Sequence, residues 1–172
     1  MIELAKFSDL DELEVFFEEL NDFLDGNYYG PEWKKGIYPT KADAESSINE
    51  DSLYVYKLDN AIVGTISLNH RQESAYENAK WNLIAHGVEV LVIRLFAVHP
   101  NYFGQSIGGT ILNFVKVKAR ELSCKTIRLD VVNQNIPACL LYEKHGFKYV
   151  STVDLGLPYD KLKWFRLYEY LL

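Results

Sequence analysis

The spacing of apolar residues predicts two helices at the start of the chain. Large apolar side chains recur every three or four positions across residues 8–24, as on one face of an amphipathic helix, and Ser8 is placed to cap that helix. A second, shorter helix is predicted over residues 40–49, with Thr40 as its cap. Residues 25–39 between them contain glycine, proline and several aromatic residues, so they are predicted to form a long structured loop.

Two runs rich in β-branched and aromatic residues predict a hairpin in the next part of the chain. The runs cover residues 53–58 and 61–68, and Asp59 and Asn60 between them form a tight-turn signal. The two strands are therefore expected to pair antiparallel. Residues 69–87 show no clear period, and the sequence indicates only a loop with a short helix there.

An almost continuous apolar run over residues 88–98 predicts a central strand that is covered on both faces. After a loop, four apolar residues at helical spacing mark the inner face of a helix: Ile107, Ile111, Val115 and Leu122. Alternation over residues 125–132 predicts the next strand. A strand, a helix and a second strand in this order form a crossover unit, so the two strands are expected to run parallel.

The remaining pattern predicts one more helix and two more strands. Residues 135–145 begin with Asn135 as a cap and end before Gly146, which is typical of a helix. Residues 147–153 and 164–172 are the last strand candidates. The predicted fold class is mixed α/β (α+β), with a mostly antiparallel sheet around a central parallel strand pair, flanked by helices.

Length and composition restrict the classes of protein to consider. A chain of 172 residues suits a single domain over residues 1–172. The net charge of −6 argues against nucleic acid as a partner, and no apolar stretch is long enough to span a membrane. The start of the chain lacks the pattern of a signal peptide, and its two cysteines have no metal-ligand spacing, so we expect a cytoplasmic protein without a metal.

The first candidate for chemistry is a glycine-rich turn at residues 104–109, with the sequence GQSIGG. It lies between the central strand and a helix, where backbone N–H groups and the helix N-terminus can receive a phosphate. The same turn could serve only as a chain reversal. It is neither a P-loop nor a dinucleotide-binding fingerprint, because its glycine and lysine spacing fits neither motif.

Together with a second stretch, this turn resembles a known family. The segments RLFAVHPNYFGQSIGGTIL and LDVVNQNIPACLLYEKHGF look like the signature of the GNAT superfamily of acyl-CoA-dependent N-acyltransferases. The resemblance covers residues 88–150. It implies transfer of an acetyl group from acetyl-CoA to a primary amine by direct attack in a ternary complex, and a central strand pair splayed to admit CoA.

The resemblance also implies how CoA is held. Phe103, Ser106 and Gly108 occupy the positions of the family's pyrophosphate-binding motif, and of these Gly108 matches outright. A bulge in the central strand is implied near Leu95, where backbone groups would pair with the pantetheine amides. An ordinary buried strand is the alternative. The implied cofactor residues in these two segments are Leu95, Phe96, Ala97, Val98, Phe103, Gly104, Gln105, Ser106, Ile107, Gly108, Gly109 and Thr110.

The second motif implies further cofactor contacts and a catalytic acid. Asn135, Ala138 and Tyr142 match the family pattern and share one face of the predicted helix. Tyr142 would protonate the departing CoA thiolate, because a thioester that breaks expels a thiolate. From the residues alone, Asn135 could equally be a helix cap and Tyr142 a half-buried aromatic residue.

A base must also deprotonate the incoming amine, which carries a proton at neutral pH. Glu89 is the candidate, as the carboxylate within the central apolar run, although it could simply be solvated; His99 and His86 are substitutes. Cys139 lies on the same helix as Tyr142 and raises an acyl-cysteine route, but packing is the preferred role because no base is placed for the thiol.

The acceptor is not identified by the sequence, and a small-molecule amine, such as a polyamine, amino acid or antibiotic, and a peptide or protein amine both stay open. Tyr28, Trp33 and Tyr38 could form an aromatic wall for a cationic amine, or belong to the core or to a dimer contact. A homodimer is expected to use aromatic residues near the C-terminus, which are Trp164, Phe165, Tyr168 and Tyr170. A non-catalytic acyl-CoA-binding sensor or structural module is the alternative function, motivated by the departures at Phe103 and Ser106.

Overall fold

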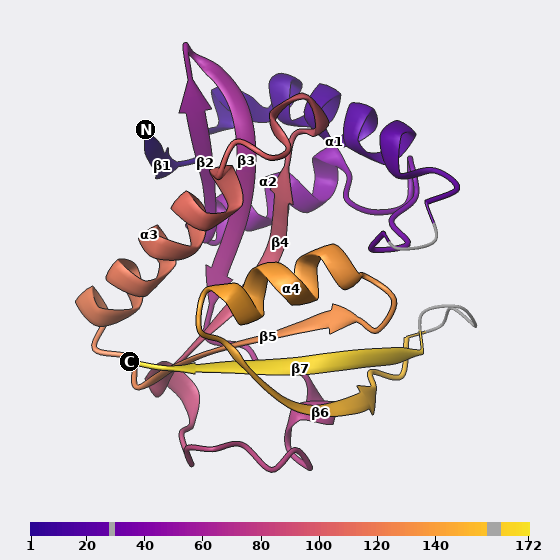
Figure 1. Cartoon of the computed structure of the whole chain (residues 1–172). Coiled ribbons are helices and arrows are strands. Elements are labelled where there is room, and N and C mark those ends of the chain that lie inside the picture. The colour runs from indigo at the N-terminus through magenta and orange to yellow at the C-terminus, as the bar shows by residue number, and fades with distance from the viewer. Residues whose placement is uncertain (28–29, 158–162) are drawn as a thin grey trace. The chain divides into compact units, whose positions relative to one another are not determined.

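A computed structural model of the chain describes residues 1–27, 30–157 and 163–172, so Tyr28 lies outside the described residues. Its helices and strands form a mixed α/β fold with one seven-stranded sheet in the order β1-β2-β3-β4-β5-β7-β6 (Figure 1). The strands are β1 (Ile2–Leu4), β2 (Leu53–Leu58), β3 (Ala61–Asn69), β4 (Val90–Val98), β5 (Thr126–Val132), β6 (Lys148–Asp154) and β7 (Trp164–Leu171). The helices are α1 (Leu10–Leu24), α2 (Lys41–Asn49), α3 (Ile107–Glu121) and α4 (Ile136–Lys144).

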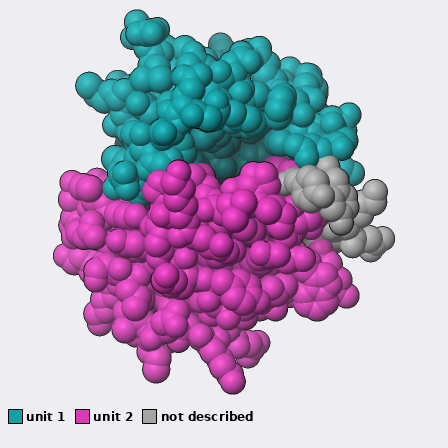
Figure 2. Space-filling view, in the orientation of Figure 1, with its two compact units in different colours: residues 1–27, 33–68, 94–114 teal, residues 28–32, 69–93, 115–172 magenta. Residues whose placement is uncertain are grey.

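Contacts divide the chain into two compact units, which Figure 2 colours separately. Unit 1 comprises residues 1–27, 33–68 and 94–114, and unit 2 comprises residues 28–32, 69–93 and 115–172. The predicted fold class is confirmed. The assignment of one domain to residues 1–172 stays a prediction.

The helices of unit 1 follow the predicted spacing but differ at one cap. Apolar residues of α1 pack in a core with residues of α2 and the hairpin, including the fully buried Leu13 and Leu53. Helix α2 has its predicted cap, because Thr40 Oγ1 accepts from the Asp43 amide and the Asp43 carboxylate accepts from the Thr40 amide. Ser8 as the cap of the first helix is wrong. A 3-10 turn at Phe7–Asp9 precedes α1 instead.

The hairpin of unit 1 is confirmed. Strands β2 and β3 pair antiparallel from Leu53 opposite Ser67 to Leu58 opposite Ala61. The two turn residues have positive φ angles, 50° at Asp59 and 66° at Asn60, as a turn that matches the strand twist requires.

The central strand is shorter than the apolar run suggested. Strand β4 begins at Val90, and Glu89 lies before it in a 3-10 turn, Gly87–Glu89. The expected parallel pair is present, with Val90 opposite Thr126 and Val92 opposite Arg128. Leu122 also differs from its prediction, since it lies beyond α3 and is 45% exposed.

Unit 2 contains the whole of the neighbouring strands β5, β7 and β6, together with the start of β4. Strand β7 pairs antiparallel with β5 over all of β5 and with β6 on its other edge. Figure 1 shows α4 lying against these strands, where Tyr142 contacts Phe147 and Tyr168. Phe165 and Tyr168, which sequence analysis offered for a dimer contact, are buried within the chain, whereas Trp164 is half-exposed.

Candidate active site

The glycine-rich turn of unit 1 leads directly into helix α3. A 3-10 turn at Pro100–Tyr102 follows β4, and the chain then reverses through Gly104 and Ser106, with φ angles of 76° and 61°. Glycine is suited to this left-handed conformation, whereas serine adopts it at some cost. The reversal allows α3 to begin at Ile107, so that its N-terminus and the exposed turn lie in one short segment.

Hydrogen bonds within this turn narrow the set of amides that could bind phosphate. The Phe103 amide donates to the Pro100 carbonyl at 3.1 Å, and the Gln105 amide donates to the Tyr102 carbonyl at 3.4 Å. The Thr110 amide donates to the Ser106 carbonyl at 3.0 Å. The other amides expected to contribute lie in the reversal and the first helical turn, where intrahelical acceptors are missing. They are those of Gly104, Ser106, Ile107, Gly108 and Gly109.

The Phe103 side chain contacts α1. Its ring meets that of Phe23 edge to face, at 5.5 Å between centroids, and both rings are about half exposed. Phe103 therefore replaces a polar residue of the family pattern with an apolar contact inside unit 1.

Strand β4 is irregular where the resemblance placed a bulge. Leu95 has a φ angle of 48° within the strand, which is unusual for a residue with a branched side chain. Its carbonyl accepts a hydrogen bond from the Thr65 hydroxyl at 3.0 Å, and its side chain joins the core of unit 1 with that of Ala97. Phe96 and Val98 are half-buried. The pairing of this segment with pantetheine stays a prediction.

A close approach between β3 and α3 helps to place the turn. A Cβ atom added to Gly64 would lie 2.7 Å from Ile111 Cδ1 and 3.1 Å from the Ala97 carbonyl oxygen. Glycine at this position therefore lets the first turns of α3 pack against the backbone of β3 and β4.

In unit 2, α4 presents the second motif. The Asn135 side chain accepts a hydrogen bond from the Ala138 amide at 3.3 Å, which confirms the cap interpretation. Tyr142 is buried, with 6% of its surface exposed. Burial raises the pKa of the Tyr142 phenol well above its usual value, and the nearby charge of Asp130 raises it further. The hydroxyl therefore keeps its proton at neutral pH.

Asp130 is a candidate site residue that sequence reasoning missed. It lies on β5, and its Oδ1 accepts a hydrogen bond of 2.6 Å from the hydroxyl of the buried Tyr76. The structure thus brings together a carboxylate and two phenols, of Tyr76 and Tyr142. One feature of the sequence could have indicated Asp130. It is a charged residue directly before the apolar pair Val131 and Val132, which leads into the second motif.

Glu89 lies in the 3-10 turn before β4, beside Lys125, the residue that precedes β5. Its carbonyl accepts from the Lys125 amide, its carboxylate pairs with the Lys125 ammonium, and its exposed side chain also accepts from the His86 amide. The hydrogen bond from Lys125 lowers the pKa of Glu89. Lys125 precedes Asp130 by five residues, about 16 Å along a strand, so this position argues against Glu89 and Tyr142 serving the same thioester. The base assignment for Glu89 stays a prediction.

Cys139 is buried, and burial raises the pKa of its thiol. A thiol that holds its proton is a weak nucleophile, which favours the packing role over an acyl-cysteine route.

The described N-terminal aromatic residues contact each other. The rings of Trp33 and Tyr38 meet edge to face at 5.6 Å, and Trp33 packs against the core of unit 1. Tyr38 is 36% exposed, so its ring keeps a surface that a ligand could contact. Substrate binding by these residues stays a prediction.

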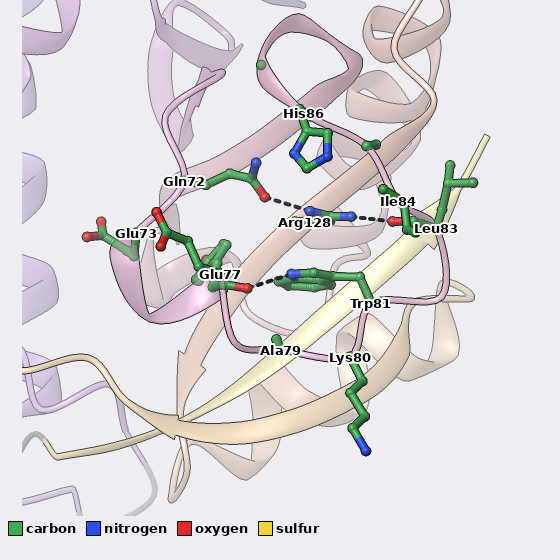
Figure 3. Close-up of a pocket in the computed structure, with 13 residues that line it drawn as sticks. Gln72, Glu73, Glu77, Ala79, Lys80, Trp81, Leu83, Ile84, His86 and Arg128 are labelled. Atoms are coloured by element: carbon green, nitrogen blue, oxygen red, sulfur yellow. Dashed lines mark hydrogen bonds between the residues drawn. The ribbon is translucent and has the colours of Figure 1, made fainter.

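Unit 2 contains a cavity of about 490 Å³ on the β5 side of residues 72–87. Figure 3 shows Arg128 beside it, between Gln72 and Leu83, with Trp81 next to the guanidinium. Among residues 1–27, 30–157 and 163–172, no group of three or more His, Cys, Asp or Glu could hold a metal ion. The same described ranges contain no helix of the length and apolarity that a membrane crossing requires.

Comparison with known proteins agrees with this geometry. The model of the acetyltransferase (GNAT) family matches residues 14–147. Streptothricin acetyltransferase of Escherichia coli is 29% identical over 124 residues, and the match spans 70% of this chain and 62% of that protein's length.

Solved structures share the fold. An acetyltransferase of the GNAT family from Streptococcus agalactiae has a TM-score of 0.79 at 19% identity, covering 100% of this chain and 95% of that one. A Salmonella typhimurium structure with its cofactor acetyl-CoA has a TM-score of 0.70 at 13% identity, covering 100% and 93%. The family match extends from α1 through α4 to Phe147 and includes both sequence motifs, so this chain belongs to the acetyltransferase (GNAT) family.

Proposed function

We propose that this protein transfers the acetyl group of acetyl-CoA to a primary amine of a small cationic acceptor. The observation that carries the proposal is the buried Tyr142 phenol beside the Asp130 carboxylate, because acyl transfer to an amine needs one proton donor and one proton acceptor. Family membership supports the same reaction.

Acetyl-CoA would supply an activated acetyl group, and two segments of the chain are suited to hold it. The turn and first helical turn at Gly104, Ser106 and Ile107 to Gly109 offer amides to the pyrophosphate. The irregular backbone of β4 at Leu95 to Val98 offers hydrogen-bonding groups to the pantetheine arm. Asn135 and Ala138 would contact the cofactor from α4.

Tyr142 would give its proton to the departing thiolate. The amine nitrogen attacks the thioester carbonyl, the C–S bond breaks, and the phenol proton passes to sulfur while the amine loses its own proton. A buried phenol with a raised pKa is still protonated when the thiolate forms, so it can act as the acid over the physiological pH range.

Asp130 is the candidate base that this structure favours. It is a carboxylate close enough to Tyr142 to raise the pKa of the phenol, so both groups can act near one reacting carbonyl. The Tyr76 hydroxyl fixes the rotation of the Asp130 carboxylate. Direct attack in a ternary complex is proposed because Cys139 is buried with a raised thiol pKa.

The acceptor is proposed to be a small-molecule amine, and the Escherichia coli relative is named for acting on one such acceptor, streptothricin. The net charge of −6 favours a cationic acceptor and disfavours nucleic acid. A single domain, a cytoplasmic location and a homodimer complete the proposal.

A binding module without catalysis is the second candidate. The apolar ring of Phe103 and the left-handed Ser106 in the cofactor turn favour it, since both depart from the family pattern. Such a protein would bind acetyl-CoA and release no thiol.

A thiol-release assay separates the two candidates. Purified protein is mixed with acetyl-CoA and a panel of amines that includes streptothricin, polyamines, amino acids and peptide N-termini. An enzyme releases CoA thiol only when an acceptor is present, whereas a binding module shows only thermal stabilisation by CoA. Binding without acceptor-dependent thiol release across the panel would contradict acetyl transfer.

A further inference from the structure

Strand β5 carries a buried arginine that contacts three separate parts of unit 2. The Arg128 side chain is 3% exposed, and its Nε donates to Glu169 Oε1 at 3.1 Å. Its Nη1 donates to Gln72 Oε1 at 2.7 Å, and its Nη2 donates to the Leu83 carbonyl at 2.6 Å. Its guanidinium also lies 4.1 Å from the centre of the Trp81 ring (Figure 3). One side chain therefore joins β7 to both ends of the segment at residues 72–83.

The Glu169 side chain on β7 accepts hydrogen bonds on both of its carboxylate oxygens. Its Oε1 accepts from Arg128 and from the Thr126 hydroxyl, and its Oε2 accepts from the backbone and side-chain amides of Asn82. The Arg128 guanidinium and the Asn82 backbone and side-chain amides can only donate, so both oxygens must act as acceptors. A carboxylate meets this need, whereas a carboxamide of the same shape would present an N–H₂ group to one pair of donors.

The Arg128–Glu169 pair fixes the positions of neighbouring residues, whether or not it stabilises the fold. Buried ion pairs are often no more stabilising than apolar side chains of similar size. The planar guanidinium, however, directs its donors at fixed angles, so it sets where Gln72, Trp81 and Leu83 lie against the sheet.

The same segment connects Arg128 to the reaction site. The Trp81 Nε1 donates to the Tyr76 carbonyl at 2.9 Å, and the two rings are 5.3 Å apart. The Tyr76 hydroxyl then donates to Asp130 at 2.6 Å. A continuous series of contacts thus runs from Arg128 through Trp81 and Tyr76 to the carboxylate beside Tyr142.

We propose that the Arg128–Glu169 pair positions the acceptor side of the reaction, by fixing residues 72–83 on the sheet so that Tyr76 orients Asp130. This inference rests on the proposed function, in which Asp130 receives the amine proton. The cavity in Figure 3 is bounded by the same segment, so its shape depends on the same pair. Arg128 and Glu169 are positioning residues, because they act on Asp130 through Trp81 and Tyr76.

The test compares three variants with two matched controls. Arg128→Lys keeps the charge but removes the planar fork, and Glu169→Gln keeps the shape but removes one acceptor oxygen. Gln72→Met removes the acceptor of the Arg128 Nη1 hydrogen bond in residues 72–83 and leaves the Arg128–Glu169 pair intact. Arg120→Lys and Glu121→Gln make the same chemical changes at exposed positions of α3 and should match the wild type.

We expect the acceptor kcat/KM to fall about tenfold or more in Arg128→Lys and Glu169→Gln, because small displacements of a reacting group reduce rate strongly. Gln72→Met should cause a smaller loss. The acetyl-CoA KM should stay within about twofold of the wild type, since the cofactor is held by other segments. Amide hydrogen exchange of residues 72–83 should accelerate in all three variants while that of α4 stays unchanged.

Two outcomes would overturn the inference. One is unchanged exchange of residues 72–83 in a folded variant, and the other is an equal loss toward acceptor and acetyl-CoA. Should Arg128→Lys fail to fold, Glu169→Gln and Gln72→Met give the same readouts. A wild-type protein that acetylates no amine would instead contradict the proposed function, and the exchange measurement would still show whether the pair holds the segment.

Discussion

The chemistry proposed for this protein depends on the surroundings of single side chains. Tyr142 and Glu89 illustrate opposite cases, because burial raises the pKa of the phenol while an exposed ion pair with Lys125 lowers the pKa of the carboxylate. The first change keeps a proton donor in its donating form. The second keeps a carboxylate ionised to lower pH and makes it a weaker base.

Tyr142→Phe tests the acid directly. The ring is retained, so the fold should be preserved, and kcat should fall about 10- to 10²-fold because the thiolate leaves without a proton. The acetyl-CoA KM should change little. In the wild type, kcat should show no loss near pH 10, where an ordinary phenol ionises, since the pKa of Tyr142 is raised. Unaltered kcat in the variant, with chemistry shown to be rate-limiting, would make Tyr142 a packing residue.

Asp130→Asn and Glu89→Gln distinguish the two candidate bases. Each change removes a carboxylate and keeps its shape. We expect kcat to fall about 10²-fold or more in Asp130→Asn, the usual reach of a general base, and to change little in Glu89→Gln. Steady-state rates at saturating acetyl-CoA and acceptor measure both. The reverse pattern would restore the sequence-based assignment of Glu89.

At the scale of elements, the turn between β4 and α3 concentrates the features that suit a phosphate. Its internal hydrogen bonds occupy the amides of Phe103, Gln105 and Thr110, and its reversal through Gly104 and Ser106 leads directly into the first turn of α3. Gly64 on β3 helps to position the start of α3, because the absence of a side chain there lets α3 pack closely against the sheet.

Gly108→Val tests the turn as the cofactor site. A branched side chain in the first turn of α3 should hold the pyrophosphate away from the amides. Since a hydrogen bond to a charged group contributes about 1.5–3 kcal/mol, the acetyl-CoA KM should rise about tenfold or more. Gly108→Ala adds only a methyl group, so it serves as the control and should have a smaller effect. A folded Gly108→Val protein with the wild-type KM would place the cofactor elsewhere.

Gly64→Ala tests the close approach of α3. The added Cβ meets the flexible Ile111 Cδ1 but also a backbone carbonyl, so the free energy of unfolding should fall by about 1–3 kcal/mol. Ile111→Val removes the nearest atom, so the double variant should lose less stability than the sum of the single variants. Denaturant unfolding of all four proteins measures this coupling. Strict additivity would show that the two groups do not collide.

At the scale of the whole molecule, two buried tyrosines link stability to alkaline pH. Burial raises the pKa values of Tyr142 and Tyr168, and Tyr168 also donates a hydrogen bond to Glu143. The folded protein therefore holds these protons more tightly than the unfolded chain, in which phenols ionise at about pH 10. This stabilisation is present below about pH 10 and is lost as the pH rises above it.

The prediction is a free energy of unfolding that declines between about pH 9 and 11, and declines less steeply in Tyr142→Phe and Tyr168→Phe. Tyr149→Phe alters an exposed tyrosine and should leave the slope of the wild type unchanged. Denaturant titrations at each pH give the slopes. Identical slopes for all four proteins would contradict the linkage.

Much of this fold could be predicted because its signals are local. The 3.6-residue period predicted α1, the β-branched runs predicted β2 and β3, and the Asp59-Asn60 turn joined them. The order of strand, helix and strand predicted the parallel pairing of β4 with β5. These features depend on backbone geometry and on neighbours within a few positions, so the sequence by itself determined them.

The boundaries and partners of the site required the tertiary structure. Strand β4 starts at Val90 and leaves Glu89 in the preceding 3-10 turn, where its carbonyl accepts from the amide of Lys125, the residue before β5. Asp130 lies beside Tyr142 and accepts a hydrogen bond from the Tyr76 hydroxyl. Tyr76 comes from a segment whose sequence has no periodic pattern. Such contacts join residues far apart in the chain, and their chemistry depends on burial and on distances between side chains, which only packing of the elements decides.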